Sequence, residues 1–197
     1  MKKIAIVGNI GSGKTTVINY LNEKGYAIIK SDEIARSLTS IDGKALPEIK
    51  KYFGSEYIDV SGSMNRKKMA DTVFQNKEKK ELLEMILTEK IKNIIQERID
   101  DFKKQGKKSV FIEIPLLFEK GNPKDYDYIF YIHSSKDNII KRVIERDDRN
   151  RKDIENILKN QIDYEKNEIF FNEKIENNSS ISELKHKIDK ILNKYYL

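Results

Sequence analysis

Residues 4–15 combine two patterns that very few folds accommodate in succession. A short apolar run, Ile4–Val7, leads directly into residues 8–15, whose sequence Gly-Asn-Ile-Gly-Ser-Gly-Lys-Thr satisfies the pattern G-x-x-x-x-G-K-[ST]. The apolar run predicts a buried strand, and the stretch from Thr16 to Lys24, which Gly25 ends, predicts a helix. A strand, a glycine-rich loop and a helix in this order are typical of phosphate-binding α/β proteins.

The residue types in this loop suit the binding of phosphate groups. Glycines let the backbone form a concave nest whose N–H groups point at phosphate oxygens, and the following helix adds partial positive charge at its N-terminus. Lys14 is expected to reach the β- and γ-phosphates, and the Thr15 hydroxyl to bind Mg²⁺. The segment therefore predicts a nucleoside triphosphate site. The residues expected to bind the nucleotide are Asn9, Ile10, Gly11, Ser12, Gly13, Lys14, Thr15 and Thr16.

The composition is that of a globular chain. Of 197 residues, 38% are hydrophobic and 36% charged, which fits one domain, or one domain that carries a helical insertion. The chain has no cysteine, so disulfides and thiolate zinc sites are excluded. His133 and His186 lie far apart in the sequence, and we expect no structural metal.

The formal net charge of +6 raises the question of nucleic acid. The basic residues are mostly lysines interspersed with Glu and Asp, a pattern of solvated faces, and a phosphate-rich small substrate accounts for the surplus equally well. We expect no nucleic-acid partner. No window approaches the roughly 18 apolar residues of a membrane span, and the apolar run after Lys2 and Lys3 is too short for a signal peptide. We therefore expect no membrane association and a cytoplasmic location.

Strands and helices alternate along most of the chain. Strands are expected at 26–29, 109–114, 127–132 and near 174–176, and helices at 136–147, 151–166 and the C-terminus. This alternation predicts a three-layer α/β fold of the P-loop NTPase type, with a parallel sheet and ligands at the carboxyl ends of its strands. Residues 45–105 instead favour helix, so we expect a core of 1–44 and 106–197 with a helical substrate-binding insertion at 45–105.

Two acidic residues follow or end predicted strands. Asp32 comes just after the second strand, where a carboxylate could accept a proton from an attacking hydroxyl or help to hold Mg²⁺. Alternatively, Asp32 or Ser31 caps the helix that begins there. Glu113, on the third strand, is a candidate Mg²⁺ ligand, or else pairs with a lysine or faces solvent.

The segment 140–151 is dense in arginine, although the rest of the chain prefers lysine. Arg142 and Arg146 lie four residues apart and share one face of the predicted helix. A guanidinium binds phosphate oxygens bidentately and stacks on an adenine ring, so this face could close over the triphosphate as a lid. The alternative is an exposed helix with Arg–Glu and Arg–Asp pairs.

At this point the chain resembles the bacterial dephospho-coenzyme A kinases over nearly its whole length. The phosphate loop is shared by many enzymes, whereas Pro-Leu-Leu-Phe-Glu at 115–119 and the Arg-x-x-x-Arg-Asp stretch at 142–147 are much more specific. Further segments follow in the family's order: Ser31–Arg36, Gly43–Gly54, Asn65–Phe74, Gln161 and Asn177-Asn178.

This resemblance implies transfer of the γ-phosphoryl group of ATP, with Mg²⁺, to the ribose 3′-hydroxyl of dephospho-coenzyme A. It implies a phosphate-loop core, a helical coenzyme-A-binding region and a lid at about 141–166. Asp32 would be the catalytic base, and Lys14 with the lid residues Arg142 and Arg146 would be further catalytic residues. Arg36 and Arg66 are candidate substrate contacts. We expect a monomer or a weak homo-oligomer.

Two positions depart from the family's pattern. The first acidic residue of its Asp-x-Asp segment is Lys30 here, and its His-Pro is Thr88-Glu89. A lysine beside Asp32 could point away along the strand alternation or depress the pKa of that carboxyl. The alternatives are a kinase for another nucleotide or small hydroxylated metabolite, and a non-catalytic nucleotide switch. A nucleic-acid-binding module lacks any recognised motif.

Overall fold

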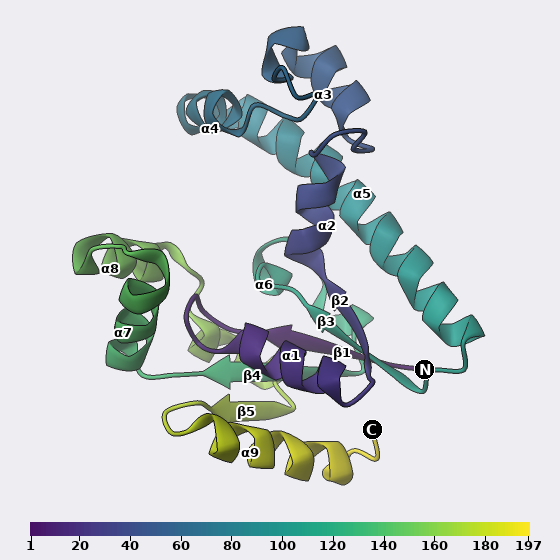
Figure 1. Cartoon of the computed structure of the whole chain (residues 1–197), viewed down its shortest axis with the longest axis vertical. Helices are drawn as coiled ribbons and strands as arrows, with labels where there is room; N and C mark the ends of the chain where they lie inside the picture. The colour runs from purple at the N-terminus through teal and green to yellow at the C-terminus, as the bar shows by residue number, and fades with distance from the viewer. The chain divides into compact units, whose positions relative to one another are not determined.

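The computed structural model describes residues 1–164 and 166–197 and contains a five-stranded sheet (Figure 1). Its strands are β1 (Lys2–Val7), β2 (Ala27–Lys30), β3 (Ser109–Glu113), β4 (Tyr128–His133) and β5 (Glu173–Glu176). They lie in the order β2-β3-β1-β4-β5, and the pairs β1–β3, β1–β4 and β4–β5 are parallel. The predicted parallel α/β sheet is confirmed, with strand bounds within one residue of those expected for β2, β3, β4 and β5.

Strand β1 is buried on both of its faces, as a central parallel strand should be. Ile4 and Ile6 pack on one side with helices α1 (Lys14–Glu23) and α9 (Ile181–Lys194). Ala5 and Val7 face the other side, where α6 (Leu117–Lys120) and the 3₁₀ helix η3 (Tyr164–Phe170) cover the sheet. The loop that follows Val7 therefore starts from a strand held by apolar packing on both sides.

Helices α7 (Lys136–Asp147) and α8 (Arg151–Asn160) form a pair with its own apolar cluster, and Ile10 packs against it. The bounds of α7 agree with the prediction. The predicted helix 151–166 is too long, because the chain leaves helical geometry at Gln161, whose ψ is 153°. The side chain of Gln161 accepts a hydrogen bond from the backbone of Ile10, and Tyr164 is buried, so long-range contacts end the helix.

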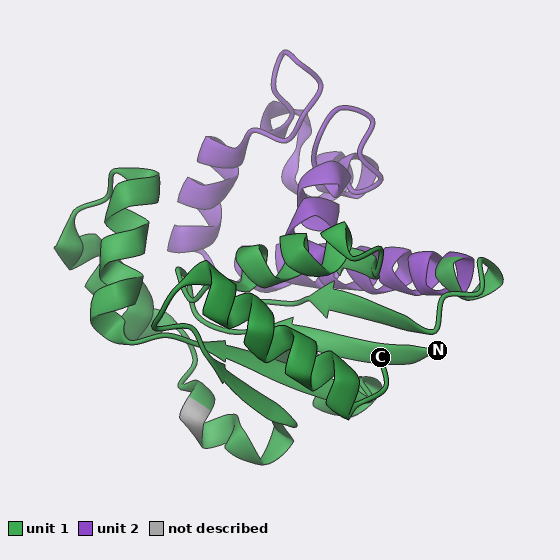
Figure 2. Ribbon diagram, turned by 60° about the horizontal axis from the view of Figure 1, so that its bottom comes forward, with its two compact units in different colours: residues 1–29, 102–197 green, residues 30–101 purple. Residues whose placement is uncertain are grey.

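The chain divides into two compact units, 1–29 with 102–197 and 30–101 (Figure 2). The sequence predicts boundaries near 45 and 105, whereas the units divide at 30 and 102. The helices of the second unit are α2 (Ser31–Leu38), α3 (Leu46–Phe53), η1 (Ser55–Tyr57), α4 (Arg66–Gln75) and most of α5 (Lys77–Lys104). The expectation of helix throughout 45–102 is wrong at 58–64. There Asp59 accepts hydrogen bonds from Ser61 and Ser63, which lower the pKa of its carboxyl and form a turn.

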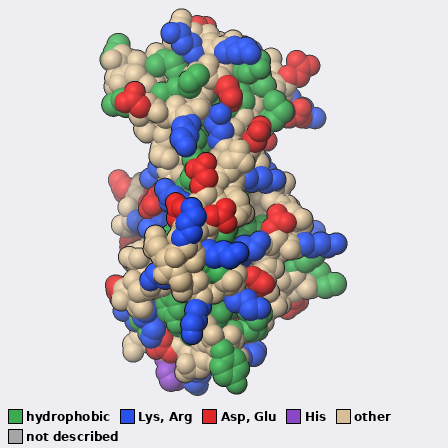
Figure 3. Space-filling model, turned by 90° about the vertical axis from the view of Figure 1, so that its right-hand side faces the viewer, with side chains coloured by type: hydrophobic (Ala, Val, Ile, Leu, Met, Phe, Trp, Pro, Cys, Tyr) green, Lys and Arg blue, Asp and Glu red, His purple; other side chains and the backbone are tan. Residues whose placement is uncertain are grey.

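Charged side chains of both signs lie over the surface. Figure 3 shows Lys and Arg among Asp and Glu on one face rather than in a separate basic patch. In the described part of the chain, no helix is both long enough and apolar enough to cross a membrane. A short 3₁₀ helix, η2 (Pro123–Asp125), precedes β4.

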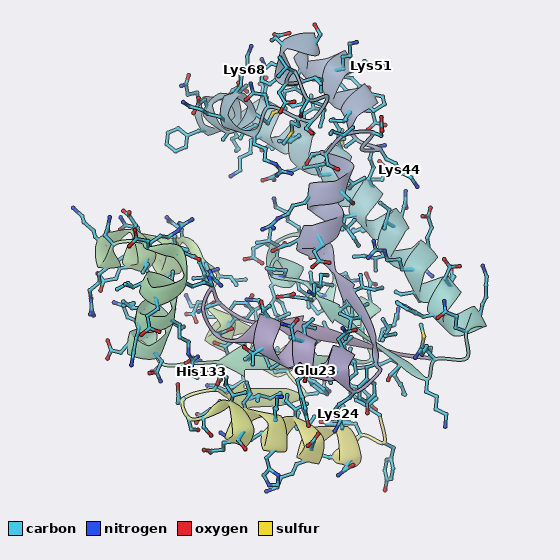
Figure 4. All side chains as sticks on the ribbon, viewed as in Figure 1. Glu23, Lys24, Lys44, Lys51, Lys68 and His133 are labelled. Atoms are coloured by element: carbon cyan, nitrogen blue, oxygen red, sulfur yellow. The ribbon has the colours of Figure 1, made fainter. Side chains whose placement is uncertain are left out.

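Polar contacts join α1 to α9 at the surface, and Figure 4 labels two of the residues, Glu23 and Lys24. Lys24 and the Tyr20 hydroxyl both donate to the Asp189 carboxylate at 2.8 Å, and Lys185 lies 3.5 Å from Glu23. The hydrogen bond from Lys24 lowers the pKa of Asp189. These exposed pairs add little stability, so the apolar contacts of α1 and α9 hold this layer.

The central strand is expected to dominate stability. Replacing Ile6, which is fully buried, by Ala should lower the free energy of unfolding by about 2–5 kcal/mol, because the substitution leaves a cavity. The same substitution at Ile169, which is 89% exposed, should cost less than about 0.5 kcal/mol. Urea denaturation of both variants measures the difference, and equal losses would contradict the assignment of the core.

Candidate active site

The loop of residues 8–13 has a backbone that depends on glycine. Gly13, the residue before α1, has φ of 103°, a left-handed conformation that other residues rarely adopt. A Cβ atom at Gly13 would also overlap the side-chain nitrogen of Asn177, and one at Gly8 would overlap the carbonyl oxygen of Ile132. The loop therefore packs so closely on β4 and on the residue after β5 that side chains have no room at these positions.

Lys14 bends its side chain back over the loop from the first turn of α1. Its ammonium donates hydrogen bonds to the carbonyl oxygens of Gly8 at 2.8 Å and Asn9 at 2.9 Å. The charge of Lys14 is thereby held beside the backbone that the motif predicts to cradle phosphates. A phosphate group at this loop would compete with the two carbonyl oxygens for the ammonium.

Side chains from distant parts of the chain hold the loop from behind. They come from α7, from the end of α8 and from the residue after β5, and each bonds one backbone group. The pairs are Gln161 Oε1 with Ile10 N at 3.1 Å, Arg142 with Gly11 O at 3.5 Å, and Asn177 Nδ2 with Ser12 O at 2.8 Å. Because these contacts are specific hydrogen bonds, the loop has one defined shape.

Arg142 is half-buried and connects several of the groups that hold the loop. Its guanidinium donates to Asn177 O at 2.9 Å and to the Ser134 hydroxyl at 3.1 Å, in addition to Gly11 O. Ser134 directly follows His133, the last residue of β4 (Figure 4). Its hydroxyl in turn donates to Asn177 O and to Asn178 Oδ1. Within the described residues, Arg142 thus bonds oxygens of the loop and of its neighbours, not acidic residues of its own helix.

Arg146, four residues further along α7, has a different environment. It is exposed and forms a bidentate pair with Asp147 at 2.6 and 2.7 Å, which lowers the pKa of the Asp147 carboxyl. The alternative interpretation from the sequence, an exposed helix with Arg–Asp pairs, therefore describes the contacts of Arg146. It does not describe those of Arg142.

Two buried polar atoms of the loop have no hydrogen-bond partner within the described residues. They are Asn9 Oδ1 and Ser12 Oγ, and Ser12 is only 1% exposed. Buried polar atoms are nearly always satisfied in folded proteins, and an unsatisfied one costs free energy. Two such atoms in one glycine-rich loop fit a site that is completed by a polar ligand.

Thr15 and Glu113 supply the oxygen ligands that Mg²⁺ prefers. Thr15 is exposed in the first turn of α1, and Glu113, half-buried, lies opposite Ile6 in the sheet, close to the start of the loop. In the part of the chain that the structure describes, no three acidic or histidine side chains gather as a metal cage. Mg²⁺ in nucleotide sites is held by few protein ligands, phosphates and water, so these two residues fit it.

In the second unit, α2 carries Asp32 and Arg36, both exposed and four residues apart on one face. The residue at the N-cap of α2 is Lys30, and within the described residues no side chain forms a capping bond there. The alternative that Asp32 or Ser31 caps the helix by a hydrogen bond is therefore wrong, although Asp32 lies in the first turn, where its charge compensates the helix dipole. The Lys30 ammonium bonds Glu33 at 3.0 Å.

Arg66, the first residue of α4, belongs to the same unit and lies near the end of α2. It donates to the hydroxyl of Thr39 at 2.8 Å, and that hydroxyl bonds the carbonyl oxygens of Ala35 and Arg36. Thr39 is 2% exposed, so it is a buried link between the two helices. The structure thus brings Arg66 beside the helix that carries Asp32 and Arg36.

Reasoning from sequence missed the residues that shape the loop. The sequence indicates Asn177 and Gln161 only as matches in the family's order, and it gives no signal for Tyr164 or Thr39. A polar residue directly after a predicted strand is a usable signal for Asn177. No pattern in the sequence indicates which loop group each side chain bonds.

A parallel sheet whose central strand ends in a glycine-rich loop with Lys14 at the head of a helix defines a phosphate-loop nucleotide-binding protein. The fold is shared with shikimate kinase from Acinetobacter baumannii, at a TM-score of 0.52 and 19% identity over 100% of this chain and 96% of that one. Sequence comparison is more specific. The family model described as dephospho-CoA kinase matches residues 2–183, and the chain belongs to that family. It is therefore an enzyme, a kinase.

Individual relatives agree over most of their length. The chain is 36% identical to the dephospho-CoA kinase of Fusobacterium nucleatum over 187 residues, 95% of each protein. It is 31% identical to that of Staphylococcus aureus strain N315, covering 97% of this chain and 92% of the relative. The solved dephospho-CoA kinase from Campylobacter jejuni has a TM-score of 0.74 at 29% identity, over 99% of this chain and 98% of that one.

A methyl group at Gly13 should disable the loop. Gly13→Ala is expected to weaken ATP binding about 100-fold, because the side chain displaces Asn177 and with it the loop. Gly25→Ala is the matched control, since Gly25 also has a positive φ, 84°, but no atom within 4 Å of an added Cβ. Calorimetric titration measures both affinities, and similar affinities for the two variants would refute the role of the close contact.

Proposed function

We propose that this chain transfers the γ-phosphoryl group of ATP to the 3′-hydroxyl of dephospho-coenzyme A, the last step of coenzyme A synthesis. The observation that carries the proposal is the family match over residues 2–183 on a chain that retains the complete phosphate loop. The proposal includes Mg²⁺ as the accompanying ion and the cytoplasm as the compartment, because ATP is available there. Dephospho-coenzyme A is the only partner that it requires.

The loop binds the triphosphate in this proposal. Backbone N–H groups and the positive end of α1 attract the β- and γ-phosphates, and Lys14 exchanges its carbonyl partners for phosphate oxygens. The unsatisfied Ser12 hydroxyl gains a partner at the same time, because it can donate to a phosphate oxygen. Arg142 keeps the loop in shape and offers the face of its guanidinium to the adenine ring.

Thr15 and Glu113 would hold Mg²⁺, Glu113 through water where the ion lies beyond direct reach. When bound, the ion neutralises part of the charge on the β- and γ-phosphates. These two side chains set its place at the edge of the sheet. Arg146 would leave Asp147 for the γ-phosphoryl group and stabilise the charge that spreads over its oxygens during transfer.

Asp32 would act as the base. Its carboxylate accepts the proton of the 3′-hydroxyl as that oxygen bonds to the γ-phosphorus, and the bond between the γ-phosphorus and ADP breaks. Its exposure and its freedom from a capping role support this assignment. The pairing of Lys30 with Glu33 also supports it, because that ammonium is then balanced by a carboxylate other than Asp32.

Arg36 and Arg66 would bind the diphosphate of the acceptor. Guanidinium groups suit a phosphate-rich substrate, since each can form bidentate hydrogen bonds with its oxygens. The hydrogen bond from Arg66 to the buried Thr39 hydroxyl restricts that side chain before substrate arrives. This preorganisation lowers the entropy that binding has to overcome.

Asp32→Asn should lower kcat about 10²- to 10⁴-fold, because the amide cannot accept the proton, while the affinity for ATP stays nearly unchanged. The measurement is ADP formation from MgATP with and without dephospho-coenzyme A. Wild-type stimulation that is lost in the variant supports both the acceptor and the base. A variant with wild-type turnover would refute the base.

A kinase for another acceptor is the second candidate, and the departures at Lys30 and Thr88-Glu89 favour testing it. The same assay decides between them. If dephospho-coenzyme A leaves ADP formation unchanged and another nucleotide or hydroxylated metabolite stimulates it, the acceptor proposed here is wrong. The proposed binding of ATP by the loop would still hold.

Substitutions of the two proposed lid arginines, Arg142 and Arg146, should have different effects on turnover and stability. Arg146→Ala is expected to lower kcat about 100-fold with little change in melting temperature, because Arg146 forms an exposed ion pair with Asp147. Arg142→Ala should lower both melting temperature and ATP affinity, since three hydrogen bonds around the loop are lost. Arg149→Ala, which removes a 3.9 Å contact with the same Asp147, is the control and should keep kcat. Thermal melts and steady-state kinetics test all three, and equal effects at 142 and 146 would contradict this division.

A further inference from the structure

The carbonyl oxygen of Gly8 accepts a hydrogen bond from one side chain and has a second possible donor nearby. Lys14 donates to it at 2.8 Å, and the hydroxyl of Tyr164 lies 3.5 Å away. The same hydroxyl donates to Pro115 O at 2.9 Å, so Tyr164 links the loop after β1 to the turn after β3. Gly8 is buried, and a buried carbonyl oxygen without a donor is unfavourable.

Nucleotide binding would take one of these donors away. Lys14 has to reach phosphate oxygens, and its ammonium then leaves the two carbonyl oxygens that it holds here. Asn9 O retains the backbone N–H of Ser12 at 3.2 Å. The one proton of the Tyr164 hydroxyl donates to Pro115 O here and can turn toward Gly8 O by rotation about the C–O bond. Pro115 is half-buried, so water can bond the carbonyl oxygen that this rotation releases, whereas Gly8 is buried.

Tyr164 is well suited to this task because its ring is fixed. It is 3% exposed, stacks on Tyr131 with centroids 4.9 Å apart and planes at 10°, and meets the edge of Phe118 at 5.9 Å. Burial raises the pKa of its hydroxyl, which therefore keeps its proton at neutral pH and remains a donor. The hydroxyl is thus held in reach of Gly8 by packing from several elements.

We propose that Tyr164 is a positioning residue that holds the Gly8 carbonyl when Lys14 leaves it for the phosphates of the nucleotide. It does not touch the reacting atoms; it lowers the free-energy cost of releasing Lys14. The inference rests on the proposed function only in that the loop binds a nucleoside triphosphate, and it is independent of which acceptor is phosphorylated.

Tyr164→Phe tests the role, because it removes the hydroxyl and keeps the ring. The variant should bind ATP about tenfold more weakly, since Gly8 O loses its remaining donor only in the bound state. The KM for ATP should rise similarly while kcat changes by less than about threefold, the pattern of an interaction equal in the ground and transition states. The rise in melting temperature that ATP produces should shrink.

Tyr126→Phe is the matched control. Tyr126 packs against the same apolar cluster, and burial raises the pKa of its hydroxyl to about 12. Within the described residues that hydroxyl forms no hydrogen bond with the loop. Its removal should leave ATP affinity unchanged. A merely structural role for Tyr164 predicts a lower melting temperature with unchanged ATP affinity, and that result would overturn the proposal.

A second measurement needs no nucleotide. In Lys14→Met the Gly8 carbonyl depends on Tyr164, so adding Tyr164→Phe should lower the urea midpoint of unfolding by more than the two single substitutions together. With Lys14 present, Tyr164→Phe removes the bond to Pro115 O, which water can replace because Pro115 is only half-buried; in Lys14→Met it removes the donor of the buried Gly8 O. Additive effects would show that the two side chains do not share Gly8 O and would overturn the proposal.

These readouts also separate the inference from the proposed kinase activity. If dephospho-coenzyme A fails to stimulate ADP formation, the acceptor is wrong, yet weakened ATP binding by Tyr164→Phe and the non-additive midpoints still support the role of Tyr164. If dephospho-coenzyme A is phosphorylated and Tyr164→Phe binds ATP as the wild type does, the activity stands and the role of Tyr164 is refuted.

Discussion

The backbone polar groups of residues 8–13 must all find partners although they belong to no helix or strand, and much of the first unit is arranged to supply them. A buried peptide group without a partner is costly, so an irregular loop needs side chains where regular structure would use the backbone. Lys14 supplies a partner from nearby, whereas Arg142, Gln161, Tyr164 and Asn177 lie 131 to 165 residues away from the loop residues that they approach. The loop consequently acquires its shape only when the C-terminal half of the chain has folded.

The carbonyl oxygens and the N–H groups of the loop backbone have different partners. Side chains, that of Lys14 among them, bind four carbonyl oxygens of the loop: those of Gly8, Asn9, Gly11 and Ser12. Anions instead bind backbone N–H groups. Ile10 N is the exception, because Gln161 accepts its hydrogen bond. Since Gln161 immediately follows α8, this bond connects the proposed lid helices to the loop that they would cover.

Local signals in the sequence predicted the parts of the fold that depend on neighbouring residues. The strand before the loop, the helix after it and α7 follow from apolar periodicity, and the loop follows from glycine spacing. The predicted helix 151–166 was too long because Gln161 and Tyr164 contact residues more than 45 positions away. The helix expected at 58–64 failed because the turn at Asp59 satisfies its backbone locally. The loop supports could not be predicted, since no periodic pattern encodes a pair so distant in sequence.

Lys30 stands where the family has an acidic residue, and a neighbouring carboxylate balances its charge. A lysine in place of a carboxylate reverses one charge, yet its ammonium lies 3.0 Å from Glu33, so the pair adds no net charge beside Asp32. The Lys30 side chain is 27% exposed, and its contact spans one helical turn, which is the geometry of a local i,i+3 pair. A carboxylate that acts as a base has to reach the proton of the attacking hydroxyl, and it does not need a second acidic residue beside it. The first turn of α2 keeps that carboxylate accessible, and the substitution is therefore compatible with proton transfer to Asp32.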